Sequence, residues 1–368
     1  MILMGDIIMN KDLSLKEKIG QKFIFGVYSD NIDCIVKLIE KYHIGGVILY
    51  KKNYSNYDEM LSVIKRLKDA NKNNKVPLFI AIDQEGGRVN RMPSEFKNIK
   101  NIYDMSKKDM KLIRKNASIT GKMLSEMGVN MNFAPVLDVC DNDKSKVLYN
   151  RCFYGDIDDV SKMGIDYVKE MSKKGVIPVI KHFPGHGVSM MDSHFITPYI
   201  FDRNKILDKH IKPFEDILNN KDVDVDAVMV GHLVIKGMTG MMPASISNRF
   251  ISEYLRKRYN YDGLVITDEM NMLSRNILYR FNYVMKMFMS LSDLYLIKIK
   301  NENEAIRMID KYIDLCNRDD DCIKILDDSI DRIIRIKNKY NINDYINYDG
   351  CNVDDINKEI DKINEMCM

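Results

Sequence analysis

Short apolar runs alternate with amphipathic stretches along most of the chain. Runs rich in β-branched residues and bounded by turn signals are typical of buried parallel strands, whereas apolar positions three and four apart indicate helices. We predict strands over residues 22–27, 45–50, 77–83, 131–139, 227–233, 263–269 and 294–299, and one that starts at 176 and ends near Lys181. Helices are expected over 13–20, 32–42, 57–71, 107–127, 160–174, 206–218, 251–259, 276–290, 302–316 and 324–340.

Strands that alternate with helices in this way predict an α/β fold, a (β/α)8 TIM-type barrel. A doubly wound sheet would carry a glycine-rich phosphate loop after its first strand, and the sequence has none there. Pro213 is expected to kink or restart the helix that contains it. We assign residues 1–345 to one barrel domain and the polar residues 346–368 to a C-terminal tail or short helix.

Composition narrows the classes of partner. The 56 Lys and Arg residues nearly balance the 53 Asp and Glu residues and are interspersed with them, which argues against a nucleic-acid surface. None of the seven cysteines has CxxC spacing, so a zinc or redox motif is not expected and a reduced compartment suits them best. The apolar N-terminus is interrupted by Asp6 and is too short to span a bilayer. We therefore expect a cytoplasmic protein with no membrane, nucleic-acid or obligate protein partner.

Polar side chains stand where several predicted strands end. In a parallel barrel these carboxyl ends meet at one face, where barrel active sites lie. The candidates at strand ends are Asp83, Asp138, Lys181 with His182, His232, and Asp268.

The segment after the third predicted strand has the chemistry of a sugar site. Asp83 can accept hydrogen bonds from two hydroxyl groups, and Arg91 can donate to hydroxyls or to a carboxylate. The alternative is a turn at Gly86-Gly87 with a surface salt bridge. Arg151 suits a substrate clamp or, equally, an ion pair with Asp138 or Asp156.

Residues 181–194 contain several candidate site residues close together in the sequence. His182 and His186 are four apart, but Pro184 would break a helix between them, so we expect no metal site and a turn shaped by residues 185–187. Asp192 and His194 would point the same way in an extended loop, where the acid could orient the ring. The alternative is an ordinary solvated pair.

Asp268 ends an apolar strand, where an unpaired carboxylate would be costly unless it is used or paired. The alternative to a reactive role is a tie to Lys181 across the barrel mouth.

Taken together, these motifs resemble family-3 glycoside hydrolases, in particular the single-domain β-N-acetylglucosaminidase branch. The resemblance covers roughly residues 13–340. The matching pieces, in chain order, are LSLKEKIGQ (13–21), GGVIL (45–49), IDQEGGRVNR (82–91), NFAPVLD (132–138), KHFPGHG (181–187) with DSH (192–194), and ITDEMNM (266–272).

The resemblance implies a retaining hydrolase, and we expect no cofactor or metal. Asp268 stands at the catalytic nucleophile, His194 at the acid/base, and Asp192 at the partner of that histidine. The positions that bind the N-acetylglucosamine unit are Asp83, Arg91, Arg151, Lys181 and His182. The substrates implied are peptidoglycan-derived fragments, which would place the chain in wall recycling, with chitin-derived oligosaccharides as a second possibility.

Some features depart from the family pattern. Ser292 replaces a small residue before the last strand, and bulky side chains such as Tyr279 and Phe288 occupy the preceding helix. We therefore expect an irregular barrel near its last strands. Glu269 beside the nucleophile position is also unfamiliar. Three alternatives stay open: a phosphorylase that uses phosphate in place of water, a non-catalytic sugar-binding barrel, and a metal-dependent barrel hydrolase.

Overall fold

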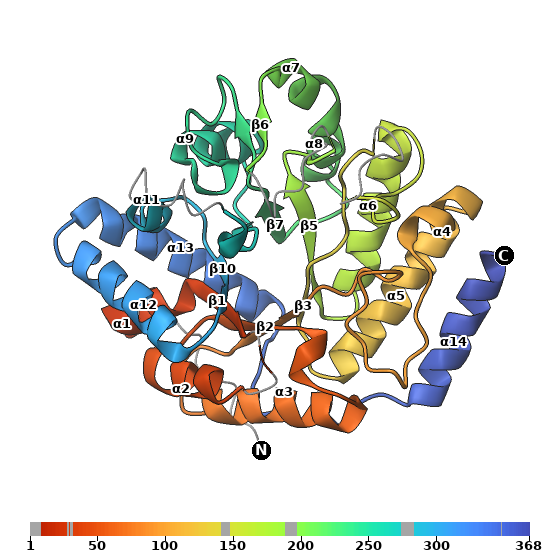
Figure 1. Ribbon diagram of the computed structural model, residues 1–368, viewed down its shortest axis with the longest axis horizontal. Helices are drawn as coiled ribbons and strands as arrows, with labels where there is room; N and C mark the ends of the chain where they lie inside the picture. Colours follow the sequence, from red (N-terminus) through yellow and green to blue (C-terminus); the bar gives the residue numbers. More distant parts are fainter. Residues whose placement is uncertain are drawn as a thin grey trace.

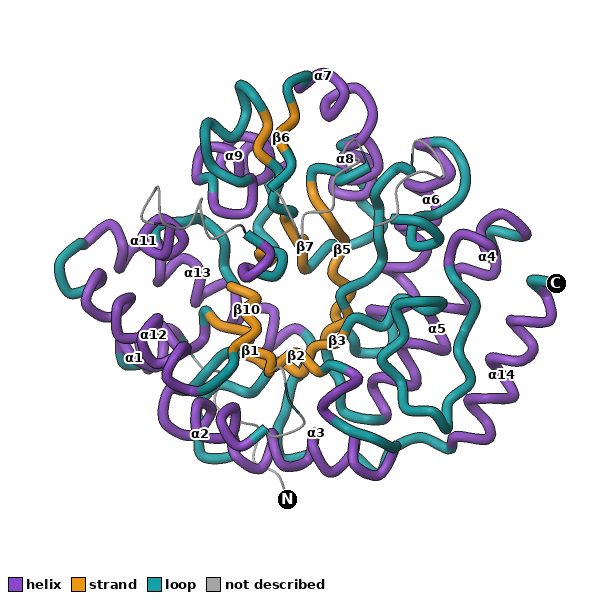
Figure 2. The backbone as a smooth tube through the Cα atoms, in the orientation of Figure 1, coloured by secondary structure: helices purple, strands orange, loops and turns teal. Residues whose placement is uncertain are grey.

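A computed structural model describes residues 9–27, 29, 32–140, 148–187, 197–273, 283–346 and 348–368. Eight parallel strands form one sheet in the order β10-β1-β2-β3-β4-β5-β7-β9, and helices surround it (Figures 1 and 2). The strands are β1 (Phe23–Val27), β2 (Gly46–Leu49), β3 (Phe79–Ile82), β4 (Met131–Asn132), β5 (Ile177–Phe183), β7 (Ala227–Val230), β9 (Leu264–Thr267) and β10 (Tyr295–Ile299). The predicted (β/α)8 barrel is confirmed.

The barrel closes between β9 and β10, and this seam is its thinnest pairing. One isolated bridge joins Ile266 to Leu294, and the N–H of Thr267 donates to the carbonyl of Leu294 at 3.0 Å. By contrast, β10 pairs with β1 over five consecutive residues, in full parallel register. The irregularity expected near the last strands therefore lies at the β9–β10 seam, and β10 itself is not displaced.

The fourth predicted strand is in the right place but shorter than predicted. Met131 and Asn132 pair with β3, and the N–H of Phe133 still donates to the Ile82 carbonyl at 2.8 Å. Pro135, which has no N–H to donate, follows two residues later. Beyond the proline the chain returns to β5, where Val136 bridges Lys181 and the N–H of Leu137 donates to the Lys181 carbonyl at 2.7 Å.

Helices cover the outside of the barrel in the predicted order. They are α1 (Leu15–Gln21), α2 (Asp33–Tyr42), α3 (Tyr57–Asn71), α4 (Ile102–Lys108), α5 (Lys111–Glu126), α6 (Ile157–Ser172), α7 (Arg203–Lys205), α8 (Lys212–Leu218), α9 (Asn248–Ile251), α11 (Tyr283–Phe288), α12 (Glu302–Cys316), α13 (Asp320–Lys339) and α14 (Val353–Met366). A π-helical segment, Ile206–His210, joins α7 to α8, and Pro213 in the first turn of α8 marks the restart that the sequence predicted. Residues 274–282, which include the first part of the helix predicted over 276–290, lie outside the described residues, and α11 falls within the rest of that prediction.

One small sheet was not predicted, whereas the C-terminal segment forms a helix, one of its two expected states. A separate two-stranded parallel sheet pairs β6 (Tyr199–Ile200) with β8 (Val234–Ile235), next to α7 and α9 (Figure 1). In the segment 346–368, α14 packs against α5 through Ile356, Ile360 and Ile363, which are spaced to lie on one helix face. None of the described helices has the length and apolar composition needed to cross a bilayer.

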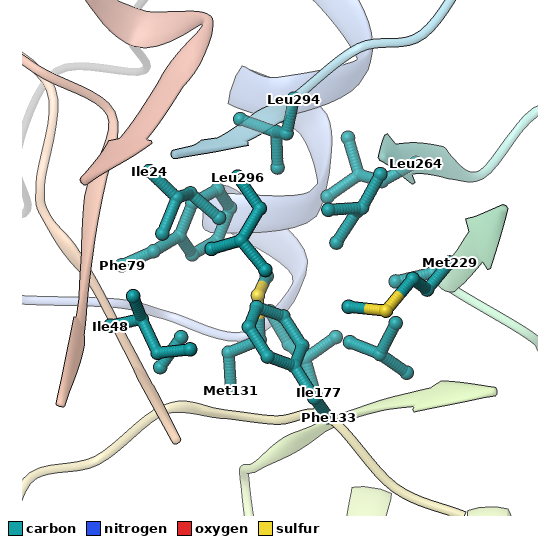
Figure 3. Close-up of a cluster of buried hydrophobic side chains, with 14 of the residues drawn as sticks. Ile24, Ile48, Phe79, Met131, Phe133, Ile177, Met229, Leu264, Leu294 and Leu296 are labelled. Carbon is teal, nitrogen blue, oxygen red and sulfur yellow. The ribbon is translucent and has the colours of Figure 1, made fainter. Parts of the chain in front are cut away.

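The barrel interior is filled by apolar side chains from neighbouring strands. Figure 3 shows a cluster in which they converge, labelled at Ile24, Ile48, Phe79, Met131, Phe133, Ile177, Met229, Leu264, Leu294 and Leu296. All ten are buried. The packed interior leaves polar chemistry to the carboxyl ends of the strands.

A buried carboxylate ties the seam together. The side chain of Asp293, just before β10, accepts hydrogen bonds from the N–H of Val265 in β9 at 2.7 Å and from Arg256 at 2.6 Å. It also accepts one from Arg332 of α13 at 3.1 Å. Since strand pairing is sparse here, this carboxylate supplies much of the connection between β9, β10 and the outer helices.

We predict that Asp293→Ala will destabilise the fold by about 3–5 kcal/mol, because it leaves two partly buried guanidinium groups without their shared anion. Asp262→Ala is the matched control, since Asp262 also pairs with Arg332 but is largely exposed; we expect it to change stability by less than about 1 kcal/mol. Urea unfolding of the three proteins measures both changes. If Asp293→Ala loses as little stability as Asp262→Ala, the seam does not depend on Asp293.

Candidate active site

A cavity of about 440 Å³ opens at the carboxyl ends of the strands. Residues from the ends of β2, β3, β5, β9 and β10 and from the loops that follow them form its wall. All six predicted site residues that lie in the described part of the chain line it: Asp83, Arg91, Arg151, Lys181, His182 and Asp268. The structure therefore brings together side chains that are up to 185 positions apart in the sequence.

Glu85 is the centre of one wall. Its carboxylate accepts two parallel hydrogen bonds from Arg151, both 2.8 Å, and pairs with Lys181 at 2.6 Å. Lys181 also donates to Asp83 at 3.0 Å, and Arg91 approaches Asp83 more loosely, at 3.9 Å. This network links β3, the loop after β4, and β5.

The network corrects two alternatives raised by the sequence. The carboxylate that pairs with Arg151 is Glu85, not Asp138 or Asp156. Lys181 pairs with Asp83 and Glu85 rather than tying down Asp268. The role of Glu85 was not predicted because this residue lies beyond the end of β3, just before the turn at Gly86, where strand alternation no longer indicates which way a side chain points.

Charge pairing keeps this wall ionised. Burial opposes the charged form of Glu85, but Arg151 and Lys181 hold its pKa well below the usual value. Burial likewise opposes the ammonium of Lys181, and the neighbouring Asp83 and Glu85 more than offset it, so the pKa of Lys181 is raised. Because each charge has a buried partner, the wall presents fixed, oriented donors and acceptors.

Asp138 orients a histidine on the adjacent wall. This fully buried carboxylate meets His182 Nδ1 at 2.6 Å and accepts the backbone N–H of His186 at 2.6 Å. Burial opposes its ionisation, but His182 and His186 lower the pKa of Asp138. A carboxylate at Nδ1 fixes the proton on that nitrogen and leaves Nε2 of His182 for a ligand.

Asp268 lies partly exposed on the cavity wall, directly after β9. Its Oδ1 accepts the N–H of Glu269 at 2.7 Å. Burial opposes its charge, while His182, His232 and this hydrogen bond lower the pKa of Asp268. His232 also holds the following residue, because its Nε2 meets the carbonyl of Glu269 at 3.0 Å. These contacts favour the ionised form of a carboxylate that lines the cavity.

The two other predicted catalytic residues, Asp192 and His194, lie outside the described residues. The backbone just before their loop leaves no room for larger side chains at two positions. A Cβ at Gly187 would stand 1.9 Å from the carbonyl oxygen of Val139, and Gly185 has a φ of 118°, so both positions require glycine.

His186 is more than a turn residue. Its side chain is buried and lines the cavity, and neither ring nitrogen has a hydrogen-bond partner within the described ranges. Burial lowers the pKa of His186, so its ring is neutral near pH 7. The sequence predicted its place in the turn but not its position on the cavity wall.

Two further findings concern cysteines and metals. Cys140 and Cys152 are joined by a disulfide beside Arg151, contrary to the expectation that the cysteines are reduced. No three His, Cys, Asp or Glu side chains in the described part of the chain gather as a metal-ligand set would.

Comparisons with known proteins agree with this geometry. Residues 14–336 match the glycosyl hydrolase family 3 N terminal domain. The chain is 35% identical over 255 residues to a beta-hexosaminidase A of Pseudoalteromonas piscicida and 33% identical over 236 residues to a beta-hexosaminidase of Psychromonas ingrahamii. These alignments cover 64% and 62% of this chain, but 42% and 67% of the two relatives, so the chain spans under half of the first.

A solved structure extends the likeness to nearly the whole chain. It is a glycoside hydrolase family 3 beta-N-acetylglucosaminidase from Paenibacillus sp. str. FPU-7, which superposes with a TM-score of 0.84 at 27% identity. The match covers 96% of this chain and 69% of that one.

The charge pairs of Glu85 predict how the free energy of unfolding depends on pH. Glu85→Gln should lower the free energy of unfolding by about 3–5 kcal/mol at neutral pH, because it leaves Arg151 and Lys181 buried without their shared anion. The native pKa of Glu85 is depressed, so its stabilisation is fully present above the unfolded pKa of about 4.3 and is lost as the pH falls further.

Urea unfolding of wild type and variant between pH 3 and 7 measures this difference, which should shrink as the pH falls. Glu359→Gln is the control, because that carboxylate forms only an exposed pair with Lys122; it should differ from wild type by less than about 1 kcal/mol throughout. A Glu85→Gln difference that stays constant across the range would contradict the assignment.

Proposed function

Because the chain belongs to glycosyl hydrolase family 3, we propose that it is a retaining β-N-acetylglucosaminidase that releases terminal β-linked N-acetylglucosamine. The observation that carries the proposal is that the Asp268 carboxylate lines the same cavity as the network of paired charges around Glu85. The names of the similar hexosaminidases support the choice of sugar.

In the proposed reaction Asp268 attacks the anomeric carbon and forms a covalent glycosyl-enzyme. His194, oriented by Asp192, gives its proton to the departing glycosidic oxygen. The same imidazole then takes a proton from water as the water attacks the anomeric carbon and frees Asp268. Two inversions give net retention. A histidine serves both steps because its ordinary pKa of about 6.5 lets it donate and accept near neutrality.

The wall residues bind the sugar. Asp83 accepts hydrogen bonds from hydroxyl groups, and Lys181, Arg91 and His182 donate or accept beside it. Arg151 holds Glu85, and through it Lys181, in place. The pairs are formed before substrate arrives, so little ordering remains to be done on binding.

We further propose that the natural substrates are peptidoglycan-derived fragments, which would place the enzyme in wall recycling. This choice rests on the likeness of the motifs to the single-domain branch of the family. A panel of muropeptide and chitin-derived oligosaccharides, with product release followed by chromatography, distinguishes the two substrate classes.

We predict that Asp268→Asn will lower kcat for an aryl N-acetylglucosaminide by on the order of 10³-fold or more, since the amide keeps the shape but is no nucleophile. Asp222→Asn, at an exposed position away from the cavity, should keep wild-type kcat. NMR of the first product from wild type should show the β anomer. An α product, or an active Asp268→Asn enzyme, would contradict the mechanism.

His194→Ala should discriminate between leaving groups. We expect a loss of roughly 10²-fold or more on a disaccharide, whose leaving oxygen needs a proton, and a smaller effect on formation of the glycosyl-enzyme from a nitrophenyl glycoside, whose leaving group does not. Pre-steady-state release of nitrophenol isolates that first step. Equal losses with both substrates would exclude His194 as the acid.

A further inference from the structure

His232 is a buried histidine to which the proposed reaction gives no part. It follows β7, and it is not among the described residues that line the cavity. Both ring nitrogens have a hydrogen-bond partner, as buried polar groups require. Nδ1 lies 2.7 Å from the hydroxyl of Ser245, and Nε2 lies 3.0 Å from the carbonyl of Glu269. The ring therefore connects a loop outside the strands to the residue that follows Asp268.

These two partners fix the hydrogen and the orientation of the neutral ring. A backbone carbonyl can only accept a hydrogen bond, so Nε2 carries the hydrogen that it donates to Glu269. Nδ1 is then an acceptor, and the hydroxyl of Ser245 donates to it. Turning the ring over would place carbon atoms where the two nitrogens are, so the contacts favour one orientation of His232.

Ser245 is itself held by contacts in the interior. It lies in a 3-10 turn, Ala244–Ile246, that directly precedes α9. The N–H of Ala244 donates to the carbonyl of Leu233, in the segment after β7, at 2.8 Å. The hydroxyl of Ser292 donates to the carbonyl of Ser245 at 2.7 Å, and both serines are buried. The support behind the ring is therefore fixed from two separate parts of the chain.

Asp268 and Glu269 lie between two regular elements. β9 ends at Thr267, and a short 3-10 turn starts at Met270. No strand ladder therefore fixes both of these residues. The N–H of Asp268 donates to the carbonyl of Val230, the last residue of β7, at 3.0 Å. The next anchor to the same segment is the contact between His232 and Glu269.

Glu269 is held at both ends of its backbone. Its N–H donates to Oδ1 of Asp268 at 2.7 Å, and its carbonyl accepts from His232. Its side chain is anchored separately, by the N–H groups of Asn271 and Lys298. Because Glu269 N–H takes one oxygen of the Asp268 carboxylate, its place sets which way the other oxygen points. That place depends on where the carbonyl of Glu269 is held.

We propose that His232 is a positioning residue for the nucleophile. Its ring, supported by Ser245, holds the carbonyl of Glu269 and thereby the angle at which the Asp268 carboxylate meets the anomeric carbon. The inference rests on the proposed function and adds to it a residue that does not touch the substrate. Reacting atoms must be closely aligned, and a displacement of about 1 Å can lower a rate by roughly 10²-fold.

Two amide variants separate the position of the ring from its charge. In His232→Gln the amide reaches the place of Nε2 and can still donate to the carbonyl of Glu269. In His232→Asn the amide is one bond shorter, stays near the place of Nδ1 and cannot reach that carbonyl. Burial opposes the charge of Asp268, and His182 and His232 lower its pKa. Both variants remove the imidazole of His232, so that change is common to the pair.

The measurement is kcat and KM for an aryl N-acetylglucosaminide. We expect kcat of His232→Asn to fall by about 10²-fold while KM changes by less than about 3-fold, because alignment in the transition state is lost and sugar binding is not. His232→Gln should keep kcat within about 5-fold of wild type, the effect of one altered hydrogen bond. Equal losses of kcat in the two variants would overturn the inference, as would a loss of kcat/KM that lies wholly in KM.

Ser245→Ala tests the support behind the ring. It should lower kcat by about 5-fold with KM unchanged, the effect of one neutral hydrogen bond. Ser247→Ala is the matched control, because that buried serine caps α9 and donates to the carbonyl of Thr239. The control should melt at a lower temperature than wild type and keep its kcat. A fall in kcat as large in Ser247→Ala as in Ser245→Ala would assign the serine to packing alone.

Crystal structures of wild type and His232→Asn give a readout that does not need the reaction. The carbonyl of Glu269 should move, and the Asp268 carboxylate should turn away from the N–H of Glu269. An unchanged Asp268 would overturn the inference and leave the hydrolase standing. If wild type cleaves no aryl glycoside, the proposed function is overturned, and the two structures still decide whether His232 places Asp268. If His232→Asn does not fold, the same comparison is made with Ser245→Ala.

Discussion

The shared carboxylate of Glu85 is the contact on which the site depends. Three cationic or acidic side chains from separate parts of the chain, Arg151, Lys181 and Asp83, are held in one network with it. Each would be expensive to bury alone, and removal of one partner leaves the others uncompensated. The network therefore has one low-energy arrangement, and that arrangement is the wall of the cavity.

A second buried carboxylate that pairs with two cations lies elsewhere in the barrel. Asp293 accepts hydrogen bonds from Arg256 and Arg332 where β9 meets β10, the seam with least strand pairing. Because Asp268 directly follows β9, the position of the proposed nucleophile depends on this seam. Two buried carboxylates, each shared by two cations, thus secure the two sides of the cavity.

The sequence predicted the features that depend on neighbouring residues better than those that depend on contacts between distant parts of the chain. The eight strands and most helices follow from local periodicity, and Asp83, Lys181, His182 and Asp268 could be placed because strand ends of a parallel barrel meet at one face. Local periodicity did not show that the fourth strand would end at Asn132.

The sequence did not show which charged side chains pair with one another. Nothing local distinguishes Glu85 from Asp138 as the acid beside Arg151, since the answer depends on which loop residues turn inward once the barrel has closed. The cavity-facing ring of His186 and the charge of Lys298 were missed for the same reason. Lys298 reads as a polar interruption of a buried strand, and only the closed barrel shows that its face is the lumen.

The central claim, that an ionised Asp268 carries the sugar as a covalent intermediate, is tested most directly by trapping. The enzyme would be incubated with a fluorinated N-acetylglucosaminide that has a reactive leaving group, digested, and mapped by mass spectrometry. The account predicts one sugar adduct on the peptide that contains Asp268. An adduct on another carboxylate, such as Glu85 or Glu269, or continued hydrolysis with no adduct at all, would contradict it.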